Sequence, residues 1–248
     1  MPTIPSYTFL HRRSFLHATS KMAAATAVFP AALLAQKSGQ EPGEQNDHIP
    51  ANERLMREHG ILRRVLLMYG EVIRRIDAKE DFPPQTVIDA AGIVRKLIED
   101  YHQKLEEEHI FPLFWAYYRK DNVLRLYAQK LVDLVELLHA QHQAGPRLTD
   151  RILSTLKSLK TADDRKRLAK DLRAFIRMSE PHMAREDTVL FPALRVIVPR
   201  QEFEAMGEKF TEIEHTTFGG DGFDIYLDLV TAFEKRLGIY DLAQFTPK

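Results

Sequence analysis

Two segments of the chain place the same chemically capable residues at the same spacing. Residues 102–112 and 182–192 both read His-x3-Glu-x4-Phe-Pro, and they lie 80 residues apart. A further histidine precedes each copy: His59 lies 43 residues before the first, and His142 lies 40 residues before the second. The chain therefore contains a duplicated unit, one histidine followed by His-x3-Glu, which indicates two copies of one helix pair.

This spacing is suited to holding a metal ion inside a helical bundle. Residues four apart lie on the same face of a helix, so a histidine and a glutamate at this spacing can bind one ion and reach toward a second. Both fall on apolar stripes, where an uncompensated carboxylate is costly to bury. Ligands on facing helices meet in bundle cores. The predicted ligands are His59, His102, Glu106, His142, His182 and Glu186.

The composition limits which metals and which chemistry are possible. The 248 residues include no cysteine, which excludes disulfides, zinc–thiolate sites, iron–sulfur clusters and cysteine nucleophiles. Imidazole and carboxylate ligands suit iron or manganese, with zinc also possible. The formal net charge is zero, and we find no phosphate-binding loop, no Ser-His-Asp signature and no basic–aromatic stripe. Nucleic acid is therefore not an expected partner.

The elements that must position these residues are expected to be helices. From residue 50 onward the apolar residues recur with a helical period and do not alternate as in strands. The expected helices span 51–77, 85–120, 122–159, from the N-cap cluster 161–164 to 198, 199–215 and 223–237, with a break or kink at Gly145-Pro146. The sequence thus predicts an all-α fold. It is an up-down-up-down four-helix bundle over 50–198, followed by accessory helices and a tail over 199–248.

The amino-terminal segment has a different character from the rest of the chain. His11-Arg12-Arg13-Ser14-Phe15-Leu16 precedes an alanine-rich apolar run, which resembles a twin-arginine signal peptide over 1–35. Residues 36–49 are polar, contain glycine and proline, and are expected to form a linker. The resemblance implies export through the twin-arginine translocase to the periplasm or cell envelope, with no membrane segment in the mature protein. A disordered basic start and a mitochondrial presequence are the alternatives.

On its histidines and His-x3-Glu motifs, the chain resembles the hemerythrin-like family of HHE cation-binding bundles over about residues 50–198. The resemblance implies a non-haem di-iron centre in which Glu106 and Glu186 bridge the two ions, together with an oxo or hydroxo bridge. Two imidazole nitrogens, two carboxylate oxygens and the solvent-derived bridge would give each ion five ligands. One position would remain open for a small molecule.

The chain departs from the oxygen-carrying hemerythrins at two places, and one further histidine is left to assign. Those proteins have a His-x3-His pair on the third helix, whereas here His139 lies three residues before His142 and is the alternative ligand. Their fourth helix has His-x4-Asp, a spacing that Asp187 satisfies, so Asp187 is the alternative to Glu186. His109, seven residues after His102, is either an outer group near the site or a core histidine.

These ligands allow three functions. The first is reversible binding or sensing of O2, another small diatomic molecule or a peroxide at a di-iron centre. The second is an oxidoreductase acting on peroxide, nitric oxide or ferrous iron. The third is metal storage or a structural metal site. Because the same ligands serve all three, the sequence does not decide whether the protein is an enzyme.

Overall fold

The computed structural model describes residues 49–120 and 125–247. The expected signal peptide, and the expected linker up to residue 48, lie outside the described residues. Unit 46–248 forms its own compact body, and the description below concerns its described part. All regular elements in that part are helices, which confirms the predicted all-α class.

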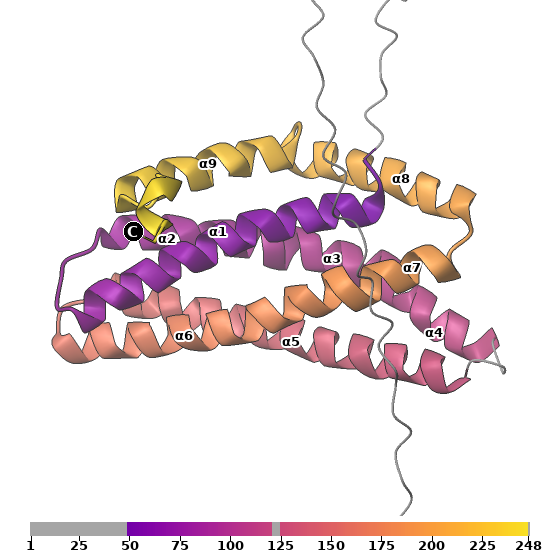
Figure 1. Ribbon diagram of the computed structural model, residues 1–248, viewed down its shortest axis with the longest axis horizontal. Coiled ribbons are helices and arrows are strands. Elements are labelled where there is room, and N and C mark those ends of the chain that lie inside the picture. Colours follow the sequence, from indigo (N-terminus) through magenta and orange to yellow (C-terminus); the bar gives the residue numbers. More distant parts are fainter. Residues whose placement is uncertain (1–48, 121–124, 248) are drawn as a thin grey trace, which may run out of the picture. The chain divides into compact units, whose positions relative to one another are not determined.

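Four long helical rods build the bundle (Figure 1). The first rod is α1 (Ala51–Asp77) and the third is α5 (Arg125–Lys157). The second rod consists of α2 (Pro84–Ile93), η1 (Val94–His102), α3 (Gln103–Leu105), η2 (Glu106–Ile110) and α4 (Phe111–Lys120). The fourth consists of α6 (Ala162–Arg185), η3 (Glu186–Leu190) and α7 (Phe191–Ile197). Rods adjacent in sequence pack against each other, and α1 closes the bundle against α6.

The rods bury one continuous core because their apolar residues recur on one face. Fully buried core side chains come from each rod, for example Leu55, Leu97, Leu138 and Leu172. The predicted interruption at Gly145-Pro146 is wrong, since α5 continues through Pro146 as one helix, and the alternative of a kink there stays a prediction. None of the described helices is long and apolar enough to cross a membrane.

Two further helices lie along the outer side of α1 (Figure 1). They are α8 (Arg200–Phe218) and α9 (Gly222–Leu237), and a short 3-10 turn, η4 (Leu242–Phe245), follows. Arg54 and Arg64 of α1 each bond a glutamate and a threonine of these helices, Glu214 with Thr211 and Glu234 with Thr231. The accessory helices are therefore tied to the rod that carries His59.

The second and fourth rods widen into π-helical turns at corresponding places. Segments η2 and η3 begin at Glu106 and Glu186, and Pro112 and Pro192 follow them at the same distance. A proline ring clashes with the carbonyl four residues earlier and provides no N–H, which favours a wider preceding turn. Those carbonyls belong to the π-helical turns themselves. The repeated Phe-Pro therefore accompanies the change of winding at both glutamates, and π-helical turns are frequent at functional sites.

Candidate metal centre

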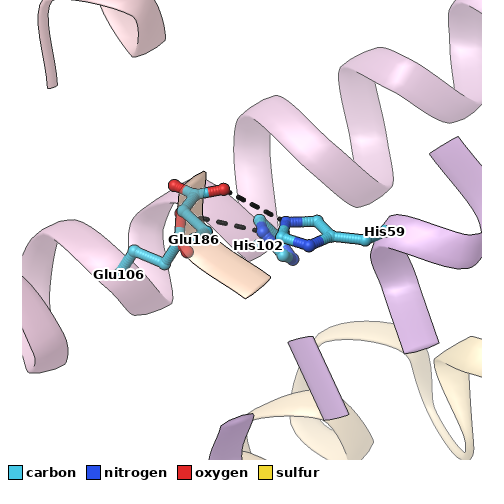
Figure 2. A group of neighbouring side chains, drawn as sticks. All are labelled: His59, His102, Glu106 and Glu186. Carbon is cyan, nitrogen blue, oxygen red and sulfur yellow. Dashed lines mark ion pairs between the residues drawn. The ribbon is translucent and has the colours of Figure 1, made fainter. Parts of the chain in front are cut away.

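The six predicted ligands meet in the middle of the bundle. His59, His102, Glu106 and Glu186 form one group of potential ligand atoms that lie within 4.8 Å of one another (Figure 2). His142 and His182 form a second such group with the same two glutamates. The two groups share both carboxylates, so the arrangement consists of two histidine pairs on either side of a pair of glutamates.

All four imidazoles direct Nε2 toward these glutamates. The rings within each pair are close, with centroids 4.8 Å apart for His59 and His102 and 5.1 Å apart for His142 and His182. The Nε2-to-carboxylate distances are 3.3 Å from His59 to Glu186, 3.7 Å from His102 to Glu106, 3.4 Å from His142 to Glu106 and 3.1 Å from His182 to Glu186. Each glutamate thus faces one histidine from its own rod and one from another rod.

The buried polar atoms of the cluster fit a bound cation. Both glutamates are fully buried. Within residues 49–120 and 125–247, neither oxygen of Glu106 or Glu186 has a hydrogen-bond partner, and Nε2 of His142 has none either. Burial, the charge of Glu186 and other nearby carboxylates raise the pKa of Glu106 well above its usual range. Leaving such groups unpaired costs free energy. A donor set of imidazole nitrogens and carboxylate oxygens suits iron, manganese or zinc.

A second layer of side chains fixes the orientation of the histidines. Each Nδ1 donates a hydrogen bond to an outer oxygen. The distances are 2.8 Å from His59 to Asp187, 2.7 Å from His102 to Glu58, 3.1 Å from His142 to Glu107 and 2.8 Å from His182 to Gln141. Since a hydrogen on Nδ1 leaves the lone pair on Nε2, this layer holds all four rings in the tautomer that binds metal.

The outer contacts cross between the two copies of the sequence repeat. The residue after each repeated glutamate accepts a hydrogen bond from the upstream histidine of the other copy. Asp187 accepts from His59, and Glu107 accepts from His142. The phenylalanines of the Phe-Pro motifs cross in the same way. Phe191 stacks on His59 and Phe111 stacks on His142, with centroids 5.8 Å and 5.4 Å apart. The structure therefore repeats the ring packing and the outer hydrogen bonds of the motif as well as its predicted ligands.

The alternative ligands lie outside the cluster. The side chain of His139 is 46% exposed and that of His142 is 1% exposed, and only His142 belongs to the cluster. Asp187 bonds the outer nitrogen of His59, while Glu186 occupies the inner position. His109 contacts Phe210 of α8, with ring centroids 5.7 Å apart, and joins neither ligand group.

Sequence reasoning missed the outer partners. Glu58 and Gln141 each immediately precede an upstream histidine, and Glu107 and Asp187 each immediately follow a repeated glutamate. The position of these residues next to the predicted ligands is visible in the sequence. It does not identify them as outer partners, because a polar or charged residue next to a ligand on a helix is usually exposed to solvent.

A small cavity adjoins the centre. It has a volume of about 20 Å3, and its wall includes His59, His102 and His182. The rest of the wall is mainly apolar, from Leu62, Ile98, Phe175, Met178 and Met183, with Glu99 as a further ionisable group. Such a volume holds about one water-sized molecule. The site therefore has room for a very small ligand beside the histidines.

The chain is similar to known proteins along most of its length. It is 47% identical over 206 residues to proteins from Mycobacterium tuberculosis and Mycobacterium bovis that are named only as uncharacterized, covering 82% of this chain and 76% of each relative. No solved structure matches the chain. Residues 133–238 match the hemerythrin HHE cation binding domain, a stretch that includes His142, His182 and Glu186 and extends over α8 and α9. The chain belongs to one family with these mycobacterial proteins, and its residues 133–238 match the model of the hemerythrin HHE cation binding domain.

Proposed function

We propose that the protein holds two iron ions between its histidine pairs and binds O2 or a similarly small molecule there reversibly. The observation that carries the proposal is the convergence of four Nε2 atoms on two fully buried carboxylates whose four oxygens have no hydrogen-bond partner among the described residues. His59 and His102 would hold one ion and His142 and His182 the other, with Glu106 and Glu186 between them. A pair of iron ions would supply reversible electron transfer to the bound molecule.

The cavity supports a small ligand. At about 20 Å3 it has room for a diatomic molecule or water. Its mainly apolar wall favours an uncharged guest, because a charged one would lose its hydration without compensation. Phe175, Met178 and Met183 belong to that apolar part of the wall.

One observation favours a second candidate, an oxidoreductase that consumes peroxide. Glu99 lines the cavity and is 5% exposed, and burial raises the pKa of its carboxyl group. Thr149 donates a hydrogen bond to Glu99 Oε1 at 2.6 Å. Arg95 pairs with the other carboxyl oxygen, Oε2, at 3.0 Å. A buried carboxyl group in the cavity can take up a proton and pass it to the occupant, which peroxide reduction requires and reversible O2 binding does not.

Metal analysis combined with optical spectroscopy tests the proposal. We expect about two irons per purified chain, with visible bands that disappear on reduction and return on exposure to air. Reversible changes with O2 support the carrier. Stable bands with turnover of peroxide support the oxidoreductase instead, and Glu99→Gln should then slow turnover without removing iron. A single zinc ion with no visible band would contradict both functions and leave a structural metal site.

A further inference from the structure

The two metal positions differ in one buried charge. Around His59 and His142 the outer layer is equivalent, since each ring bonds a carboxylate that also pairs with a cation: Asp187 with Arg63, and Glu107 with Lys104. The outer partners of the other two histidines differ from each other. His102 bonds the carboxylate of Glu58, whereas His182 bonds the neutral amide of Gln141.

Glu58 has a buried carboxyl group that pairs with no lysine or arginine among the described residues. Its side chain is fully buried, and its Oε1 has no hydrogen-bond partner. Among the described residues its only ion pair is with His102. Arg54, one helical turn earlier, instead pairs with Glu214 of α8. The carboxylate of Glu58 therefore has the imidazole of His102 as its ionic partner in a low-dielectric interior.

Gln141 differs from Glu58 in two respects. It carries no charge, so it makes Nε2 of His182 a weaker donor to a metal than a carboxylate would. Its amide can also present either oxygen or nitrogen to the ring, while an ionised carboxylate only accepts hydrogen bonds. Glu58 thus locks His102 in the metal-binding tautomer, and Gln141 does so only in one of its two orientations.

We infer that the two positions bind metal unequally, and that the ion held by His59 and His102 binds first and more tightly because of Glu58. This inference rests on the proposed metal function. A protein with limiting metal would then carry its single ion at the His59 and His102 position. The ion at the His142 and His182 position would be the exchangeable one.

Titration of the metal-free full-length protein with Co2+ in the absence of air tests the inference. Visible absorption follows binding, and dialysis with metal analysis gives the number of ions; Fe2+ can be measured by dialysis alone. The wild type should bind two ions in steps about 10-fold to 100-fold apart in affinity, the usual effect of an outer partner. The His142→Ala variant should show one binding step with the tight affinity of the wild type. The His59→Ala variant should show one binding step with the weak affinity of the wild type.

Substitutions that exchange a carboxylate and an amide of nearly the same shape test whether Glu58 causes the difference in metal affinity. Glu58→Gln should weaken the tight step about 10-fold to 100-fold and bring the two steps together, and Gln141→Glu should tighten the weak step. Glu53→Gln is the matched control, because it removes the same charge from an exposed position of α1 and should change neither step. Circular dichroism checks that each variant is folded.

The outcomes separate the inference from the proposed function. Two ions bound with indistinguishable affinity, or a Glu58→Gln variant with the same two steps as the wild type, would overturn the inference and leave the metal function intact. Failure of the folded wild type to bind Co2+ or Fe2+ at all would overturn both.

Discussion

At the scale of single residues, burial distinguishes the histidines of the cluster from those outside it. His139 and His142 both fit a helical spacing, but their side chains are 46% and 1% exposed. A ligand to a shared centre must reach the interior, where its nitrogen loses contact with water and needs another partner. Nε2 of His142 has no hydrogen-bond partner, which is the state expected of a ligand atom without its metal.

The first prediction compares these two histidines. His142→Ala should lower the iron content of the purified protein by about one ion per chain, because it removes one of two nitrogen donors from one position. His139→Ala should leave the iron content unchanged, since that side chain lies at the surface. Metal analysis of the two proteins, prepared identically, makes the comparison. Equal losses from both variants would show that the ligand assignment on α5 is wrong.

At the scale of elements, helix ends and π-helical turns determine which face of each helix carries the predicted ligands into the bundle. The fourth rod begins with a capping box, in which the Thr161 side chain accepts from the backbone N–H of Asp164 and the Asp164 side chain accepts from the backbone N–H of Thr161. That rod later carries His182 and Glu186. The capping box fixes the residue at which this helix begins. The start of the helix in turn sets the direction in which His182 and Glu186 face, about two dozen residues further along the rod.

The second prediction concerns this cap. Thr161→Ala should lower the free energy of unfolding by about 1 kcal/mol, because an orphan N–H of the first turn loses its acceptor. Thermal or denaturant unfolding followed by circular dichroism measures the loss. Asp163→Asn is the control, since the Asp163 side chain pairs with the exposed Lys166 and does not cap the helix. An effect as large for the control would argue against the cap.

The third prediction concerns the docking of α8 and α9 on α1. Glu214 is 1% exposed, pairs with Arg54, and its Oε1 accepts the backbone N–H of Phe223 at the start of α9. Glu214→Ala leaves the buried guanidinium of Arg54 without a charged partner and should cost about 3 kcal/mol of stability. Glu212→Ala, at an exposed position of the same helix, should cost much less. Chemical denaturation compares the two variants. Similar stabilities would mean that the pair does not hold α8 in place.

At the scale of the whole molecule, we propose that the chain is exported by the twin-arginine route to the periplasm or cell envelope. The support is the Arg12-Arg13 pair followed by Phe-Leu and an alanine-rich run. This route carries proteins that have already folded. Export in that state suits a protein whose ligands come from four different rods, because the metal centre exists only after the bundle has formed.

The fourth prediction tests that route. Replacing Arg12 and Arg13 together with lysine should keep the full-length precursor in the cytoplasm of a bacterium that has the twin-arginine pathway. The unchanged chain should appear in the periplasm in a shortened form. Cell fractionation followed by immunoblotting distinguishes the two. Lys21→Gln removes a positive charge outside the pair and serves as the control. Normal export of the double variant would rule out the proposed signal.

The sequence by itself determined the helices and the six candidate ligands. Local rules suffice for both, because a helical period and a His-x3-Glu spacing are properties of neighbouring residues. The predicted interruption at Pro146 does not occur, because α5 packs along its length against neighbouring rods and this packing offsets the cost of one proline. Only the tertiary structure decided between His139 and His142, and between Asp187 and Glu186 at the inner position. It also revealed Glu58 and Gln141 as partners of histidines more than 40 residues away. Those contacts join different rods, and the packing of whole helices sets them.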